Sequence, residues 1–271
     1  MSIIFNAGQA IEWTLRLAAV YILLDSAGKL YHYKEFKDDG ISSWKYFRTN
    51  RYFTSRGKTF THILDVIFEY RAWLYILTLR LLSALYLLFL PQQNMASTLC
   101  LLILFIAGGL VNLRNGAFGA ETENRLGLMI VGALLLHCLV PTPLITHITL
   151  WFIAIQSCLS YLTAGMVKLL DKEWRNGNGI FNVVNSPNLM VWDKPAFFFK
   201  RYPAPGKFLT WATIVMECTF PLVLIIGSPA FVLFLIWGIL FHSAIATLLG
   251  LNKFFWVWIA TYPAIIYIAQ R

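Results

Sequence analysis

Residues 95–112 read MASTLCLLILFIAGGLVN, a run in which no side chain carries a charge. A helix that crosses the hydrocarbon core of a bilayer needs about 20 mostly apolar residues, because each residue advances the helix by about 1.5 Å. Asn94 precedes the run and Arg114 closely follows it. Polar residues at both ends of an apolar run are typical of the two membrane surfaces, so this run predicts a membrane-spanning helix.

The composition of the whole chain points the same way. Of its 271 residues, 58% are hydrophobic and 13% are charged, whereas about a quarter of an average soluble domain is charged. So few charges can hardly cover the surface of a soluble domain of this size. The composition therefore excludes a disordered chain, a collagen-like chain, a disulfide scaffold and an ordinary cytosolic enzyme.

Most of the chain divides into apolar stretches of membrane length. We expect an all-α integral membrane protein with a single multi-pass domain over residues 1–271, a bundle of about eight transmembrane helices with an interfacial helix and one long loop. The predicted spans are residues 10–28, 71–90, 95–112, 125–140, 144–168, 208–226, 229–250 and 253–269. The fourth span is short, and we expect it to be half-buried or fused with the fifth near Pro141 and Pro143.

Two long polar stretches interrupt the spans, at residues 29–70 and 169–207. The first contains SWKYFRTNRYFTSRGK (residues 43–58), whose aromatic and basic side chains are typical of an interfacial helix with snorkelling lysines and arginines. The second contains several glycines and prolines, which predict a mostly irregular loop.

The basic residues gather in particular connections. The net charge is +9, and eighteen of the 22 Lys and Arg residues lie in connections that the predicted spans place on one face. These connections are residues 29–62, 112–125, 168–207 and 250–253. Because basic loops tend to stay on the cytoplasmic side, we expect these loops in the cytoplasm and both termini outside, in a cell membrane. The excess positive charge then indicates membrane topology and not a nucleic-acid partner.

The cysteines and two of the histidines do not suggest a metal site. All four cysteines lie in apolar stretches and none forms a CxxC pair, so we expect small helix residues. His137 and His147 flank a turn without metal-ligand spacing and are interpreted as interfacial residues. No metal is predicted.

Ionisable side chains inside membrane spans are costly and often mark function. In this chain they are Glu12, Arg16, Asp25, Arg71, Arg80, Lys168, Glu217 and His242. Arg16 follows Glu12 by one helical turn, which favours an internal ion pair over a catalytic pair. Arg80 is interpreted as a structural clamp or as a holder of an anion or carbonyl. His242 is interpreted either as a structural hydrogen-bonding residue or as a functional one.

Lys168 and Glu217 are the strongest candidates for a site. Lys168 follows the small pair Ala164–Gly165, which lets helices approach closely. A desolvated lysine releases its proton more easily and can act as a base, although a lysine at a helix end can also simply snorkel to the surface. Glu217 lies four residues before Pro221, whose ring distorts a helix. We expect its carboxylate either to be protonated or to pair with a buried cation.

The segment YLTAGMVKLLDKEWRNGNGI (residues 161–180) resembles the signature of the horizontally transferred transmembrane (HTTM) domain family. That family includes the membrane part of vitamin K-dependent gamma-glutamyl carboxylase, whose signature is an aromatic residue, Ala-Gly, a lysine pair, Leu, acidic residues and Trp. Lys168 falls on the position of the catalytic lysine, and Val167 replaces the lysine before it. Further family-like pieces are Leu15–Arg16, Glu217 with Pro221, and Phe241–His242.

The resemblance implies a chemistry. In the carboxylase, the lysine deprotonates a reduced naphthoquinone, which reacts with oxygen to give a base strong enough for glutamate carboxylation. By resemblance, the catalytic residues are Lys168, Glu217 and His242, and a reduced quinone would be bound by Arg80, Arg16, Asn124 and Trp174. The segment Glu123–Asn124–Arg125 lies where the family has an Asn–His pair, and it lacks the His.

The tract LLDKEWRNGNGIFNVV (residues 169–184) also resembles bacterial membrane proteins that mature secreted toxins of the sporulation-delaying type. This implies a small secreted precursor peptide or a companion maturation protein as partner, besides the lipid bilayer. Three hypotheses follow: a membrane enzyme with Lys168 as base, a non-catalytic maturation factor, and a transporter with a polar path along Glu217, His242 and Arg80. The absence of inverted repeats disfavours the transporter.

Overall fold

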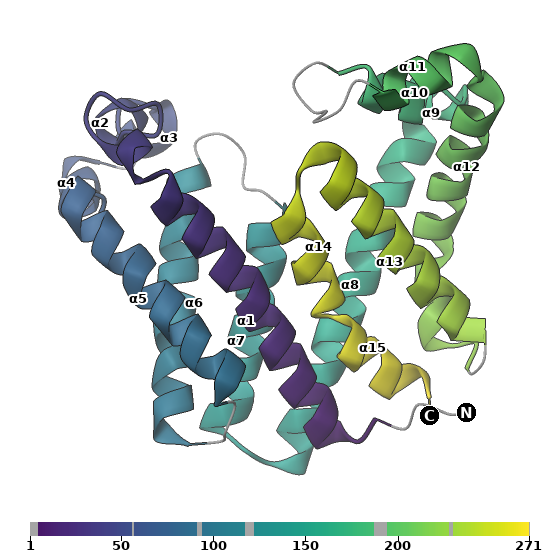
Figure 1. Ribbon diagram of the computed structural model, residues 1–271. Coiled ribbons are helices and arrows are strands. Elements are labelled where there is room, and N and C mark those ends of the chain that lie inside the picture. The colour runs from purple at the N-terminus through teal and green to yellow at the C-terminus, as the bar shows by residue number, and fades with distance from the viewer. Residues whose placement is uncertain are drawn as a thin grey trace. The chain divides into compact units, whose positions relative to one another are not determined.

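The computed structural model describes residues 5–55, 57–90, 94–116, 122–186, 194–227 and 230–270. Every regular element within these ranges is a helix (Figure 1). The predicted all-α class is therefore confirmed for the described part of the chain.

Five helical segments in the described ranges are long and apolar enough to cross a membrane, so the expected number of about eight spans is wrong. They are α5 (Tyr70–Phe89), α6 (Met95–Asn115), α8 (Pro143–Leu170), the segment Pro203–Leu224, and α13 (Ala230–Leu249). Segments of this length and apolarity support insertion into a membrane.

The three remaining predicted spans lie outside this set for separate reasons. Helix α1 (Ala7–Tyr31) carries four ionisable residues, namely Glu12, Arg16, Asp25 and Lys29. Helix α7 (Thr122–Leu139) has 18 residues, and its first turn is polar. The last predicted span is split into α14 (Asn252–Ile259) and α15 (Tyr262–Ala269). Pro263 explains the split, because its ring removes an N–H donor and clashes with the preceding turn.

Pro221 acts in the same way one span earlier. Helix α12 (Pro203–Thr219) ends two residues before it, and the chain continues as a 3-10 helix, η3 (Phe220–Leu224). The predicted distortion next to Glu217 is thus confirmed. The fourth and fifth predicted spans are two separate helices, α7 and α8, with Pro143 as the first residue of α8.

Both polar stretches contain more helix than the sequence predicted. In place of one interfacial helix, the first stretch forms η1 (Tyr33–Phe36), α2 (Trp44–Phe47), α3 (Arg51–Thr54) and α4 (Lys58–Ile67). The second, predicted to be mostly irregular, forms α9 (Lys172–Arg175), α10 (Gly179–Val184) and α11 (Lys194–Arg201). Gly57 and Gly177 have positive φ values of 93° and 82°, which suit glycine and separate these short helices.

The described chain forms two compact units, and the division falls within helices α1 and α8. The N-terminal unit comprises residues 12–149, and the C-terminal unit comprises the described residues of 1–11 and 150–271.

In the N-terminal unit, α6 packs against both α5 and α7 (Figure 1). Asn112 Nδ2 on α6 donates to the carbonyl of Asn124 on α7 at 3.0 Å. A Cβ added to Gly108 would lie 3.3 Å from Leu128, and one added to Gly132 would lie 2.9 Å from Phe105. In these contacts, the residue numbers increase along α7 as they decrease along α6, so the two helices are antiparallel over this length.

The first polar stretch lies at the C-terminal end of α6. Arg114 Nη2 donates to the carbonyl of Ser42 at 2.8 Å, and Nη1 donates to that of Phe68 at 3.3 Å. The ring of Tyr52 lies next to Gly116. Ser42 and Tyr52 from the connection at 29–62 and Arg114 and Gly116 from the connection at 112–125, which we expected on one face, therefore meet at the same end of this unit.

In the C-terminal unit, α13 packs against α14 and η3. Helix α10 packs against α12, where Thr210 Oγ1 accepts from Ile180 N at 3.1 Å and donates to Gly206 O at 2.8 Å. Ser157 on α8 and Thr261, between α14 and α15, form a buried hydroxyl–hydroxyl hydrogen bond of 3.0 Å. The face of α8 that contains Ser157 also carries the candidate site.

Candidate functional site

One face of α8 carries three residues that organise the site. Tyr161, Gly165 and Lys168 are spaced four and three residues apart, so they lie on the same side of the helix. Tyr161 and Gly165 are buried, whereas Lys168 is partly buried near the C-terminal end of the helix. Along this face, the hydroxyl of Tyr161 is followed by Gly165, which has no side chain, and then by the amine of Lys168.

Lys168 forms an ion pair with Glu217 of α12. Its Nζ atom donates to both carboxylate oxygens, at 2.6 Å and 2.9 Å. The Glu217 side chain is 5% exposed and that of Lys168 is 20% exposed. Of the two expectations for Glu217, protonation or pairing with a buried cation, the geometry shows the pair.

Gly165 makes this pairing possible. A Cβ at Gly165 would lie 2.7 Å from the backbone nitrogen of Cys218 and 2.9 Å from Cβ of Glu217. Any side chain larger than hydrogen would therefore separate α8 from α12. The small residue that the sequence analysis noted before Lys168 is a contact point between these helices.

Trp174 covers the amine of Lys168. The Nζ atom lies 5.3 Å from a ring centroid of Trp174, within the range of a cation–π interaction. Asp171 holds α9 in place, since its carboxylate accepts from Trp174 N at 3.0 Å. Gly179 lies against the Trp174 ring, where a Cβ would come within 2.4 Å. Trp174, predicted to bind a cofactor, thus belongs to the Lys168 site.

A buried hydrogen-bond network lies about two turns from Lys168 toward the N-terminus of α8. Tyr161 Oη lies 2.6 Å from His242 Nε2 on α13 and 3.2 Å from Tyr262 Oη on α15. All three residues are at most 5% exposed. Gly238 leaves room for the Tyr262 hydroxyl, because a Cβ there would lie 1.9 Å from it.

Aromatic rings enclose this network. Phe220 of η3 stacks on Tyr161 with ring centroids 3.8 Å apart, and Trp258 of α14 stacks on His242 at 5.0 Å. Within the described part of the chain, His242 Nδ1 and Trp258 Nε1 are buried without a hydrogen-bond partner. Such atoms are costly to bury, and a polar ligand atom or a water would satisfy them.

The structure brings together three of the seven predicted site residues, namely Lys168, Glu217 and Trp174, and places a fourth, His242, in the neighbouring network around Tyr161. Sequence reasoning missed Tyr161, Tyr262 and Trp258. The helical spacing from Lys168 back to Tyr161 would have identified the tyrosine. No sequence signal identifies Tyr262 or Trp258, because their approach depends on the break between α14 and α15.

Arg16, Arg80 and Asn124 belong to the N-terminal unit. Arg16 pairs with Glu12 at 2.8 Å, as predicted. Arg80 is a buried clamp: its Nη1 atom donates to Asp25 at 2.5 Å and to Ser26 at 3.1 Å, and Lys29 also pairs with Asp25.

Asn124 accepts a hydrogen bond from the Tyr21 hydroxyl at 2.8 Å. Like Arg16 and Arg80, it therefore has a protein partner within its own unit. All three residues belong to the N-terminal unit, whereas Lys168 belongs to the C-terminal unit.

Arg114 is a buried cation that the sequence analysis did not single out. It is 2% exposed and has no acidic partner among the described residues. Its guanidinium instead lies over aromatic rings, 4.8 Å from Trp73 and 5.3 Å from Phe68, and donates to two backbone carbonyls. Cation–π contacts replace the missing carboxylate and hold the polar stretch on the end of α6.

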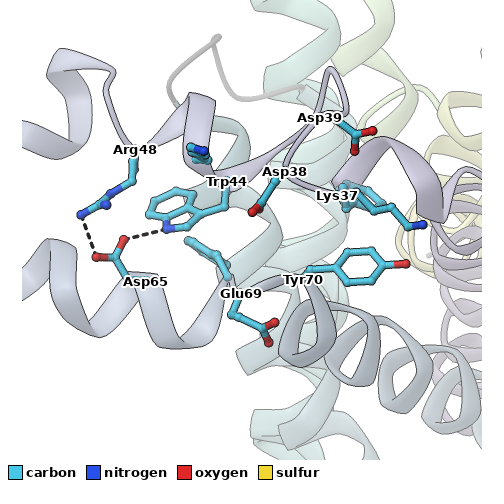
Figure 2. A pocket seen from close by; sticks show the side chains of 11 residues that line it. Lys37, Asp38, Asp39, Trp44, Arg48, Asp65, Glu69 and Tyr70 are labelled. Carbon is cyan, nitrogen blue, oxygen red and sulfur yellow. Dashed lines mark hydrogen bonds and ion pairs between the residues drawn. The ribbon is translucent and has the colours of Figure 1, made fainter.

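A pocket of about 760 Å³, lined in part by Phe36, Trp44 and Phe68, lies in the N-terminal unit (Figure 2). Asp65 lies between Arg48 and Trp44 and accepts from both, at 2.8 Å and 2.9 Å. Positively and negatively charged side chains line the pocket, namely Lys37, Asp38, Asp39, Lys45 and Glu69. This mixture selects neither a cationic nor an anionic ligand, so the pocket indicates no particular chemistry.

The C-terminal unit therefore offers a partly buried ion pair, stacked aromatic rings and a buried hydrogen-bond network along one face of α8. These are the components of a site for proton transfer in apolar surroundings. Comparisons with family models, curated proteins and solved structures give no significant match to this chain.

Proposed function

We propose that the chain is a membrane-embedded enzyme of the vitamin K-dependent carboxylase-like (HTTM) type, with Lys168 as general base in the modification of a peptide. The Lys168–Glu217 ion pair carries this proposal. An apolar pair of similar volume would often stabilise the fold as well or better. An ion pair at this position therefore supports a role in proton transfer.

The position of one proton decides what Lys168 can do. With the proton on Lys168, the site holds two opposite charges. Transfer of that proton to Glu217, across a contact of 2.6 Å, leaves a neutral amine and a neutral carboxylic acid, which need no charge to be buried. The amine can then accept a proton from a substrate while Glu217 keeps the first one.

We propose that a quinone would bind beside His242. A flat apolar ring with oxygen atoms suits an aromatic wall that contains two buried nitrogen atoms without partners in the described structure. We assign its binding to Tyr161, His242 and Trp258, with Trp174 at the Lys168 end. A bound reduced quinone would supply reducing equivalents to oxygen. Contributions of Arg80, Arg16 and Asn124 rest on the family resemblance alone.

The same resemblance supports the partner and the location. We propose a small secreted precursor peptide as substrate and a multi-pass position in the cell membrane. The loops at 29–62 and 168–207 would face the cytoplasm, because they hold fifteen of the Lys and Arg residues. A quinone would reach the C-terminal unit from the lipid phase.

Oxygen uptake by the purified full-length protein in nanodiscs, with a reduced short-chain naphthoquinone as probe, tests the enzyme hypothesis. We expect the protein to raise uptake above the protein-free rate. Lys168→Ala should lower this increment at least 100-fold, the usual minimum effect of removing a general base.

Lys172→Ala is the matched control, since Lys172 is an exposed lysine on the neighbouring helix α9. It should retain the full rate and the wild-type unfolding temperature, whereas Lys168→Ala should unfold at a lower temperature because the buried Glu217 loses its counter-charge. Full activity in a folded Lys168→Ala protein would rule out the base. No uptake by the wild-type protein would leave the non-catalytic maturation factor as the better hypothesis.

A further inference from the structure

A second cavity, of about 280 Å³, lies in the C-terminal unit where α10, α11 and α12 meet. Its walls include Asn178, Phe181, Phe199, Lys200, Gly206 and Lys207. The proposed quinone and Lys168 chemistry does not use this cavity, because its described lining includes none of Lys168, Glu217, Trp174 and His242. It is large enough for a small polar headgroup.

The charge of this cavity has one sign. Lys200 and Lys207 line it, and no described lining residue is acidic. Neither lysine forms an ion pair in the described structure. Glu173 is an acidic residue that contacts the cavity wall: its carboxylate accepts a hydrogen bond from the side-chain amide of Asn178 at 3.0 Å. This hydrogen bond partly stabilises the charge of Glu173. Two unneutralised ammonium groups beside one cavity favour an anion.

The side chains, and not the start of α12, provide this preference. The helix begins at Pro203, and Pro205 follows two residues later. Proline has no N–H group, so two of the backbone donors that a helix start usually offers to an anion are missing. An anion would depend on Lys200 and Lys207, which act as mobile point charges.

Exposed aromatic rings surround the two lysines. Phe181 and Phe199 line the cavity, whereas Phe197 and Phe208 are 78% and 71% exposed on the adjoining helices. Exposed aromatic and basic residues together are typical of a membrane–water interface. The ligand that suits both features is an amphiphile with an anionic head and an apolar body.

We propose that this cavity binds the phosphate group of an anionic membrane lipid between Lys200 and Lys207. The rings of Phe181 and Phe199 contact the apolar part of the headgroup region. This binding is independent of the chemistry at Lys168, so either proposal can fail without the other.

Native mass spectrometry of the full-length protein, titrated with phosphatidylglycerol or phosphatidylcholine in detergent, measures the binding. The wild type should retain phosphatidylglycerol preferentially. Lys200→Gln with Lys207→Gln should weaken the tightest site about 30-fold (about 2 kcal/mol). Lys34→Gln with Lys58→Gln is the control, because these lysines are equally exposed in the other basic stretch, and it should change the affinity less than threefold.

Three further arms decide the interpretation. Lys200→Arg with Lys207→Arg should restore binding and so exclude a folding defect. Inorganic phosphate at millimolar concentration should leave the lipid bound; displacement would support the same phosphate site with a free phosphate compound as its ligand. Equal loss in both glutamine pairs, or no preference for phosphatidylglycerol over phosphatidylcholine, would overturn the proposal.

Discussion

At the scale of single residues, burial of the Lys168–Glu217 ion pair has a free-energy cost that the attraction between the two charges must offset. Removing two charges from water costs several kcal/mol for each ion, and their attraction offsets this only when the geometry is good. Here both carboxylate oxygens accept from Nζ, and Trp174 lies over the same ammonium. The pair is therefore stable as a unit, and loss of one member leaves the other charge buried.

Glu217→Gln tests this balance. The substitution keeps the shape and one acceptor, but leaves the Lys168 ammonium without a counter-charge. We expect the free energy of unfolding to fall by about 3 kcal/mol and oxygen uptake to be lost. Thermal unfolding in nanodiscs measures the first effect.

The double variant Lys168→Met with Glu217→Gln separates stability from activity. It contains no uncompensated charge, so most of the lost stability should return while activity stays absent. If the double variant were less stable than Glu217→Gln alone, the two residues would not form a coupled pair.

Sequence reasoning identified Lys168, Glu217 and His242 for a physical reason: an ionisable residue in an apolar stretch is visible without a structure. It could not show which of them meet. Arg80 and Lys168 are both basic residues in apolar helices, yet Arg80 donates to Asp25 and Lys168 to Glu217. Tyr262 carries no such signal, because tyrosines are common in membrane helices.

At the scale of elements, the contact between α8 and α12 depends on one missing side chain. Gly165→Ala would place a Cβ 2.7 Å from the backbone nitrogen of Cys218, and backbone atoms cannot turn aside as a flexible side chain can. We expect a loss of about 1–3 kcal/mol in stability and a large loss of activity, because the shift would separate Lys168 from Glu217.

Gly109→Ala is the matched control for that experiment. Gly109 lies within α6, and a Cβ there meets nothing within 4 Å in the described structure. Because Ala favours a helix over Gly by about 1 kcal/mol, this variant should be as stable as the wild type or more so. Thermal unfolding of the two variants side by side gives the comparison. Equal effects of both substitutions would contradict the close contact at Gly165.

The elements themselves were predictable where apolar runs are long and uninterrupted. Residues 95–112 form most of α6 as expected, whereas residues 253–269 form two short helices. Because both runs are apolar, each was predicted to form one membrane span, although Pro263 could have indicated the break. The short helices of the polar stretches were missed, because they depend on tertiary contacts such as those of Arg114 and not on periodicity.

At the scale of the whole molecule, the number of crossings decides on which side the basic loops lie. Helices α5, α6 and α8 alone would put the stretches at 29–62 and 168–207 on opposite sides of the membrane. The loops would share a side if α7 crosses as well. Helix α7 is antiparallel to α6 from Asn124 to Gly132, and at its other end His137 contacts Thr146 of α8 at 3.2 Å. It therefore extends from the C-terminal end of α6 to the start of α8.

We accordingly expect α7 to cross together with α6, despite its polar first turn. Its 18 residues extend about 27 Å, close to the thickness of a hydrocarbon core. Single cysteines placed at Lys58 and Lys172, in a protein whose four native cysteines are changed to serine, should both resist a membrane-impermeant maleimide on intact cells. A cysteine at Thr142, exposed between α7 and α8, should react. Labelling of only one of positions 58 and 172 would show that an odd number of helices crosses between them, and would remove α7 from the membrane-spanning set.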